Sequence, residues 1–146
     1  MAQQSHRRVA LLSIHPRHAT AILDGRKTVE LRRTRLPIDV SHVVVYATSP
    51  MQTIVGWFEV DAIERDRPSR LWNRHGPATG VSRREFRTYF HGAEEGTAIS
   101  VGRVVVLKSP VELSRVWSSS PPQSFCYLDA RLAQRRLRMT EQKIPA

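Results

Sequence analysis

The spacing of apolar residues at the start of the chain predicts a strand followed by a helix. Residues 8–14 form an apolar, β-rich run. Residues 16–23 follow with helical spacing and begin with a proline, which is favoured in the first turn of a helix. Gly25 stands where a helix commonly ends in a left-handed residue. The helix is therefore expected to stop at this glycine.

A short strand with charges on one side is predicted directly after this stop. In the segment TVELRR, apolar and charged residues alternate with a period of two. Val29 and Leu31 face one way. Glu30 and Arg32 face the other way, about 7 Å apart along the strand. Lys27, at the strand entrance, can lean over the charged side.

The middle of the chain predicts two more strands and a polar stretch. Residues 42–48 are nearly continuously apolar, which indicates burial on both sides. Residues 53–63 form the next strand, with Gly56 as a candidate bulge. Residues 61–80 are rich in Arg, Pro and Gly, and we expect a loop there with a short helix at residues 71–72.

A further helix is predicted where Ser82 and Glu85 have the spacing of a capping box. Helical periodicity then places three aromatic residues on one face: Phe86, Tyr89 and Phe90.

The rest of the chain predicts closing strands and a basic tail. Residues 96–107 and 111–117 have strand character, and residues 118–125 have loop composition. Residues 128–139 have helical spacing and many arginines.

Together these elements predict an α+β fold. Mostly antiparallel strands with short flanking helices favour a small, mixed, partly open β-barrel. A chain of 146 residues suits one domain, which we place at residues 8–128. Residues 129–146 are expected to form a basic helical tail that is partly disordered.

Composition excludes several classes of protein. No apolar run approaches the eighteen residues of a transmembrane helix, so no membrane contact is predicted. The N-terminal MAQQSHRR lacks the apolar segment of a secretory signal, and a cytoplasmic location follows. A single cysteine, Cys126, excludes an internal disulfide and a CxxC zinc cluster.

The charge balance points to an anionic partner. Lys and Arg number 23 against 13 acidic residues, a net charge of +10, and arginine supplies nearly all of the excess. Arginine offers a planar fork of donors that matches phosphate, and it stacks on bases. Such an excess favours nucleic acid, and the basic segment at residues 131–138 adds to it. The alternative is an arginine-rich composition in which charge serves only solubility.

Common catalytic and cofactor motifs are absent. The chain has no GxGxxG, GxxxxGK[ST] or GxSxG motif. His15 and His18 are three residues apart but lack a convincing third ligand, so we predict neither a metal nor a cofactor. The charged group on the strand remains, and it is either a ligand site or a solvated ladder of ion pairs. The residues alone leave that choice open.

The segment ILDGRKTVELRR resembles the GxKxxExR signature of the ASCH-domain family. Gly25, Lys27, Glu30 and Arg32 occupy its four defined positions. LLSIHP, VYATSP, IVGWFEV and PPQSFCYL are similar to further segments of such domains. The resemblance implies a PUA-like β-barrel with a cleft beside the signature strand, into which the lysine, glutamate and arginine point.

The resemblance implies three activities: RNA binding, RNA cleavage, or amide hydrolysis on a modified cytidine. The hydrolase branch has a threonine three residues after the signature lysine, where this chain has Glu30. We expect a module that binds RNA, single-stranded nucleic acid or a nucleotide-like small molecule, without a cofactor, as a monomer or weak dimer. The alternative is a metal-independent ribonuclease or a modified-nucleoside amidohydrolase acting in the same cleft.

Each role has candidate residues. In binding, Lys27 and Arg32 would hold phosphate or a base edge, oriented by Glu30. Tyr46 or Trp57 could stack on an unpaired base. In cleavage, Lys27 would stabilise the charge on the phosphorane while Glu30 or Tyr46 moves a proton from the 2′-hydroxyl. Three serines are further candidates at the cleft mouth: Ser13, Ser49 and Ser124.

Overall fold

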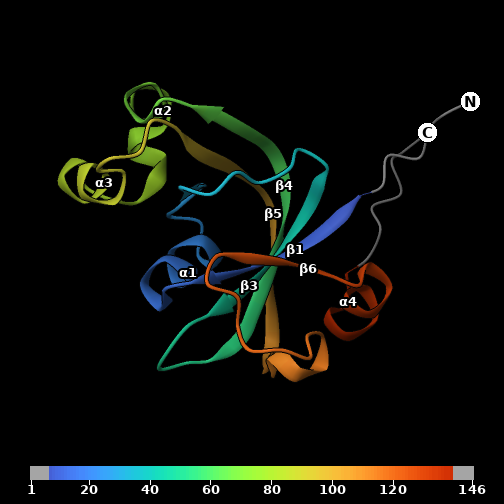
Figure 1. Cartoon of the computed structure of the whole chain (residues 1–146). Coiled ribbons are helices and arrows are strands. Elements are labelled where there is room, and N and C mark those ends of the chain that lie inside the picture. Colours follow the sequence, from blue (N-terminus) through green and yellow to red (C-terminus); the bar gives the residue numbers. More distant parts are fainter. Residues whose placement is uncertain (1–6, 140–146) are drawn as a thin grey trace, which may run out of the picture.

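The computed structural model describes residues 7–139. Six strands form one sheet in the order β2-β5-β4-β3-β1-β6, with short helices around it (Figure 1). The strands are β1 (Arg8–Ile14), β2 (Val29–Arg32), β3 (Val40–Ala47), β4 (Thr53–Asp66), β5 (Gly96–Val111) and β6 (Phe125–Leu128). The helices are α1 (Pro16–Leu23), α2 (Pro68–His75), α3 (Arg83–Tyr89) and α4 (Ala130–Leu137), with the 3₁₀ helices η1 (Gly76–Thr79) and η2 (Leu113–Arg115).

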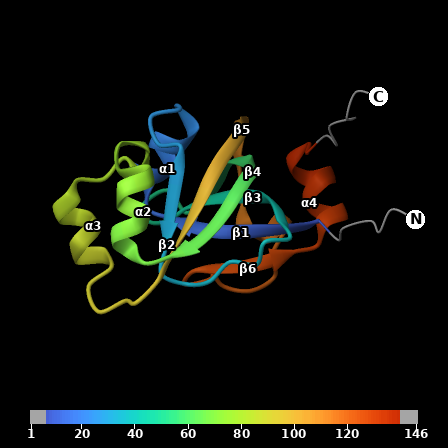
Figure 2. The same ribbon diagram turned by 90° about the horizontal axis from the view of Figure 1, so that it is seen from above.

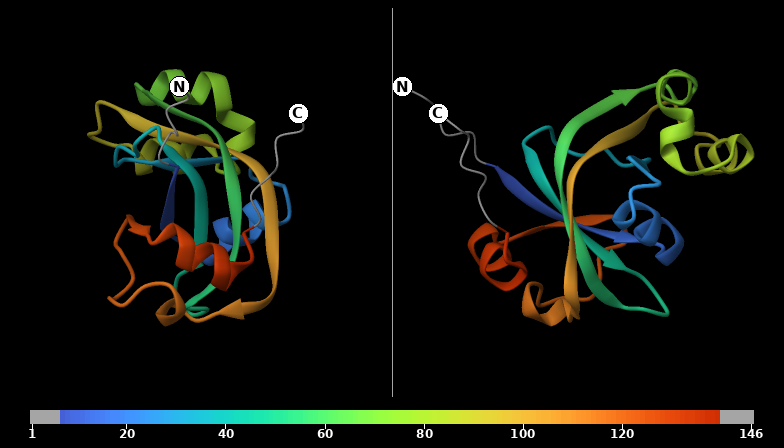
Figure 3. Two further views of the ribbon diagram at one scale, coloured as in Figure 1. Left: turned by 90° about the vertical axis from the view of Figure 1, so that its right-hand side faces the viewer. Right: turned by 180° about the vertical axis from the view of Figure 1, so that it is seen from behind.

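The sheet is mixed and mostly antiparallel, as the sequence predicts. β1 and β3 are parallel, and every other neighbouring pair is antiparallel. β4 and β5 bend along their length, so that the sheet curls around α1 (Figures 2 and 3). β2 and β6 are the two outer strands in the sheet order of the described residues. The α+β class is therefore confirmed, whereas closure into a barrel is not shown.

The sheet is buried on both faces. One core cluster fills the side covered by α1 and includes Leu12, Ile22, Val43, Val45 and Phe58. A second cluster lies on the other side, where α4 packs, and includes Leu11, Val44, Trp57, Ala133 and Leu137. Alternate residues of β1 and β3 therefore point into different cores, which explains why these strands are almost continuously apolar.

Gly56 lies beside an irregularity in strand register, as expected for a bulge. The register of β4 against β5 shifts between Ile54 and Gly56. A Cβ atom on Gly56 would lie 2.6 Å from Leu23 Cδ2 and 2.6 Å from the carbonyl oxygen of Val105. Only glycine therefore allows α1 and β5 to approach β4 this closely.

Two sequence-based assignments are wrong. The stretch at residues 61–80 is not mainly a loop, because β4 continues to Asp66 and is followed by α2 and η1. The predicted closing strand at residues 111–117 is the end of β5 followed by η2. In the first case residues 64–66 are only partly buried, so hydrophobic periodicity gave no strand signal beyond residue 63.

Helices α2 and α3 cover a third core cluster at the end of the sheet. Its buried members are Val29, Leu31, Leu71, Phe86, Phe90 and Ala98. The predicted capping box is present: Ser82 Oγ accepts from the Glu85 N–H, and the Glu85 carboxylate accepts from the Ser82 N–H. Of the three aromatic residues placed on one face, Phe86 and Phe90 are buried and Tyr89 is partly exposed.

Helix α4 begins where Asp129 caps it by accepting from the Leu132 N–H. Ala133, Leu137 and Met139 are buried against the sheet.

The predicted division of the chain at residue 128 stays a prediction, although α4 shares a core with β1 and β3. The expected disorder near the end of the chain concerns residues 140–146, which lie outside the described residues. Among residues 7–139, none of the helices has the length and apolar character needed to cross a bilayer.

Candidate active site

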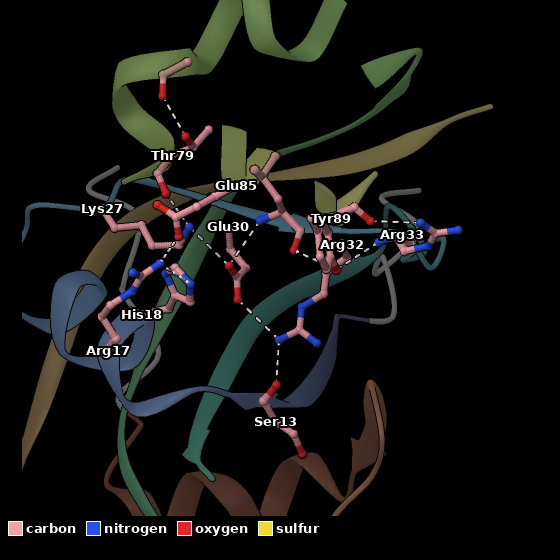
Figure 4. Close-up of polar contacts among 12 residues, drawn as sticks. Ser13, Arg17, His18, Lys27, Glu30, Arg32, Arg33, Thr79, Glu85 and Tyr89 are labelled. Carbon is pink, nitrogen blue, oxygen red and sulfur yellow. Dashed lines mark hydrogen bonds and ion pairs between the residues drawn. The ribbon is translucent and has the colours of Figure 1, made fainter. Parts of the chain in front are cut away.

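The three charged residues of the signature lie together, two of them buried and Arg32 partly buried. Lys27 is 2% exposed and Glu30 is 5% exposed. Glu30 Oε1 lies 3.4 Å from Lys27 Nζ, and Glu30 Oε2 lies 3.3 Å from Arg32 Nη2 (Figure 4). One carboxylate therefore separates two cations. A solvated ladder of ion pairs is excluded, because an exposed strand face would leave these groups in water.

The end of α1 and the start of β2 position this group. Gly25 has a φ of +85°, so the chain leaves the helix through the left-handed conformation that glycine favours. The Lys27 N–H then donates to the Ala21 carbonyl at 3.0 Å. Glu30 pairs with Ile99 in the ladder between β2 and β5, and its Oε1 accepts from the Leu31 N–H at 3.1 Å.

Lys27 joins the strand to the helices above it. Its Nζ donates to the carbonyl of Thr79 in η1 at 2.5 Å. A Cβ atom on Gly80, where φ is +68°, would lie 3.3 Å from Lys27 Cβ, so glycine leaves room for the lysine stem. Burial lowers the pKa of Lys27, and the attraction of Glu30 opposes this shift.

Arg32 joins β2 to the opposite side of the curled sheet. Its Nη2 donates to the carbonyl of Ser13 at the end of β1, at 2.8 Å. Its Nη1 donates to the carbonyl of Ser124, just before β6, at 3.4 Å. The guanidinium thus bridges two segments that no backbone pairing connects to β2 in the described residues. Some of the N–H donors of Arg32 are therefore already engaged by groups of the protein itself.

Lys27, Glu30 and Arg32 lie at the floor of a cavity of about 610 Å³. Lys27, Glu30, Leu31 and Arg32 line it from β2 and its entrance, and the end of β1, the start of α1 and the length of α3 line its other sides. The remaining lining residues are Ser13, Ile14, His15, His18, Val81, Arg84, Glu85, Phe86, Thr88 and Tyr89. This volume is in the range of small-ligand sites and can hold a nucleotide.

An ion pair between α1 and α3 lies at the rim of this cavity. Arg17 donates to the Glu85 carboxylate, and this bond together with the Ser82 N–H lowers the pKa of Glu85 to about 2. His18 is beside them, and burial, followed by the charge of Lys27, lowers the pKa of its imidazole. A neutral imidazole can accept a proton near neutral pH.

Of the other candidate residues, Ser13 lines this cavity, and Tyr46, Ser49 and Ser124 do not. The Oγ of Ser13 donates to the carbonyl of Pro122 at 2.6 Å. Tyr46 is buried in the second core cluster on the other side of the sheet, with Trp57. Ser49 lies exposed in a turn, and Ser124 contributes its main-chain carbonyl. The functional roles of Tyr46, Ser49 and Ser124 stay predictions.

Several lining residues carry no sequence signal that marks them as site residues. The spacing of His18 from His15 suggests only a metal ligand, and the position of Glu85 suggests only a helix cap. Arg84 and Tyr89 are more than fifty residues from the signature, and no local pattern connects them to it. Residues 7–139 contain no group of three or more His, Cys, Asp or Glu side chains that could hold a metal ion.

Comparison with known proteins supports the resemblance that the signature motif indicated. A model of the ASCH domain matches residues 12–108, which is more than half of the chain. The chain belongs to the ASCH-domain family. An ASCH domain-containing ribonuclease of Zymomonas mobilis is 32% identical over 142 residues, which cover 93% of this chain and 95% of that protein. A large ribosomal subunit protein uL22 of Ureaplasma parvum is 27% identical over 119 residues, 81% of this chain but only 38% of that protein.

The fold is also shared. The crystal structure of ASCH from Zymomonas mobilis has a TM-score of 0.81 and 32% identity, covering 93% of this chain and 98% of that one. Crystal structures of two variants of the Zymomonas protein, one with serine replaced by alanine and one with tyrosine replaced by phenylalanine, have the same TM-score of 0.81 at 30% identity. The likeness extends over nearly the whole of both chains.

Proposed function

We propose that this ASCH-domain protein is a ribonuclease that cleaves RNA in the cavity above Lys27, Glu30 and Arg32. The observation that carries the proposal is the burial of Lys27 and Glu30, with Arg32 beside them, at the floor of a cavity of about 610 Å³. The full-length similarity to a protein named as a ribonuclease supports cleavage over binding alone. This reverses the order of preference that the sequence suggested.

The chemistry proposed is attack of the 2′-hydroxyl on the adjacent phosphodiester. Negative charge grows on the non-bridging oxygens during this step, and fixed cations in a dry site stabilise it most. Lys27 Nζ, held between Glu30 and the Thr79 carbonyl, is fixed in this way. Because the two side-chain cations Lys27 and Arg32 supply positive charge, we expect cleavage to survive a chelator.

Proton transfer needs an acceptor for the 2′-hydroxyl and a donor for the leaving 5′-oxygen. Glu30 is an acceptor at the floor, and His18, whose pKa is lowered, is a second acceptor at the rim. Lys27 can donate, because a lowered pKa makes its ammonium a stronger acid. Tyr46, on the other side of the sheet, is not given a role in this scheme.

Lys27→Met tests the proposal, because methionine keeps the buried stem without the charge. End-labelled RNA is incubated with each protein, with and without chelator, and cleavage is followed on gels. We expect the variant to lose cleavage by about 10²–10³-fold, as sites do when a charge-stabilising donor is removed. Arg26→Gln is the matched control, because Arg26 is an exposed neighbour whose ion-pair partner, Asp24, is also exposed.

Three outcomes decide between the functions. Cleavage that persists in Lys27→Met would place the activity elsewhere. If the parent protein binds RNA without cleaving it, the cavity is a binding site and not an active site. Replacing the 2′-hydroxyl of the substrate by 2′-O-methyl should abolish cleavage, and continued cleavage would refute attack by that group.

A further inference from the structure

Helix α3 presents three arginines whose charges are not neutralised within the protein. Arg83, Arg84 and Arg87 are exposed, and in the described part of the chain none of them forms an ion pair. The helix has one acidic residue, Glu85. Its carboxylate pairs with Arg17 and accepts from the Ser82 N–H, so it is already engaged.

The positions of these arginines oppose helix stability. Arg83 and Arg84 are the first two residues of α3, where the positive end of the helix dipole disfavours cations. Arg83 and Arg87 are four residues apart, so their like charges are neighbours on the helix surface. Folding alone would favour acidic or neutral residues here. Charges that weaken the helix carrying them point to a role outside folding.

Most arginines of the other basic helices lack this conflict. In α4, Arg135 and Arg136 lie in the last turn, where cations stabilise the helix. In α2, Arg74 also lies in the last turn and pairs with Glu64 and Asp66. Local stability therefore explains Arg74, Arg135 and Arg136. It does not explain Arg131, which lies in the first turn of α4, four residues before Arg135, and in the described residues forms no ion pair. The arginines of α3 differ from Arg131 in their place, because α3 lines the cavity and α4 does not.

The α3 arginines lie beside the cavity. Arg84 lines it, together with Thr88 one turn further along the helix. Helical periodicity places Arg83 and Arg87 on the adjoining side of α3, next to Arg84. α3 lies at the outer edge of the molecule, with its exposed side open to solvent (Figures 2 and 3). The three guanidinium groups can thus continue a path that leads out of the cavity.

We propose that α3 binds the phosphates of nucleotides flanking the one held in the cavity, so that the substrate is a single-stranded RNA several nucleotides long. The inference rests on the proposed function for the cavity. Guanidinium groups match phosphate oxygens with paired donors. A nucleotide inside the cavity cannot remain paired in a duplex, so the strand must be single where it enters.

The test compares a double variant on α3, Arg83→Gln with Arg87→Gln, against Arg135→Gln with Arg136→Gln on α4. Both remove two exposed arginines, and Arg84 is kept so that the cavity wall is unchanged. Binding of a fluorescent 2′-O-methyl RNA decamer is measured by anisotropy across a salt series. Cleavage of an RNA dinucleotide and an RNA decamer is measured in parallel.

We expect the α3 variant to bind the decamer at least fivefold more weakly, with a salt dependence shallower by about 0.7 for each phosphate that it no longer neutralises. Its decamer cleavage should fall much more than its dinucleotide cleavage, and its melting temperature should not fall. The α4 variant should bind like the parent. Equal loss of binding in both variants, or none in the α3 variant, would overturn the inference. If the parent cleaves neither RNA, the proposed function fails, and the anisotropy series still decides the role of α3.

Discussion

Replacing Glu30 by glutamine is the sharpest test of how the cavity floor is held together. The substitution keeps the shape of the side chain and removes its charge. Lys27 and Arg32 then face each other, because their partner atoms were the two oxygens of this one carboxylate, at 3.4 Å and 3.3 Å. A hydrogen-bonding oxygen remains, but no negative charge does.

The expected loss follows from the burial of this group. Removing one partner of a buried ion pair costs about 3–5 kcal/mol, because it leaves a buried charge uncompensated. Arg32 keeps its hydrogen bonds to two carbonyls, which moderates the loss, so we expect about 3 kcal/mol. In a chain of this size that corresponds to a melting temperature lower by roughly 10 °C. Lys27→Met should melt much closer to the parent, because it removes a costly buried ammonium.

The stability loss of Glu30→Gln should depend on pH. Burial lowers the pKa of Lys27 in the folded protein. Between that pKa and the ordinary value of 10.5, the unfolded chain binds more protons than the folded protein does. The free energy of unfolding therefore rises with pH over this range. Without Glu30 this pKa falls further, since its main favourable charge is gone. The deficit of Glu30→Gln should therefore be largest near neutral pH and shrink as pH rises and Lys27 loses its proton.

Urea unfolding at several pH values measures these differences. Asp24→Asn is the control, because it also breaks a carboxylate–arginine pair, but an exposed one with Arg26. It should unfold like the parent. If Glu30→Gln also unfolds like the parent, or if its deficit grows with pH, the carboxylate does not hold the two cations together.

Two further outcomes are expected. Arg32→Lys should lower the free energy of unfolding by about 1–3 kcal/mol, because lysine cannot reach the carbonyls of both Ser13 and Ser124, and urea unfolding at constant pH checks this. The lowered pKa of Glu85 means that its ionisation stabilises the fold fully above the ordinary value of 4.5 and ceases to do so as pH falls through about 2. Glu85→Gln should therefore be less stable than the parent at pH 6 and approach it in acid, and a parallel decline of both proteins would refute the contribution of this pair.

The bounds of α1 and the start of β2 were predictable because particular residues in the sequence indicate them. Pro16 and Gly25 delimit α1, and the change to a period of two marks β2. The end of β4 carried no such signal. Its side chains are only partly buried, so strand pairing with β5 holds it in place without an apolar face.

The candidate site was predictable only in part. The signature identified Lys27, Glu30 and Arg32, and alternation placed the last two on one side of β2. The residues that roof the cavity come from α3, far along the chain, and the partners of Arg32 are main-chain carbonyls, which no side-chain pattern reveals. Tyr46 shows the limit of a strand pattern in a sheet with two cores, since either side of β3 could have been the cavity side.

The path of the chain through α2 and α3 has a consequence for how such proteins diverge. Asp66 and Gly96 are paired at the ends of β4 and β5, so the segment between them leaves and rejoins the sheet at neighbouring points. Loops and insertions of this kind can change in length and sequence while the strands that carry them stay in register. The segment supplies the cavity roof, whereas the floor comes from β2 and its entrance. Selection can therefore exchange the segment that roofs the cavity as a unit, provided that its apolar side chains still cover Val29 and Leu31 and that one carbonyl remains within reach of Lys27.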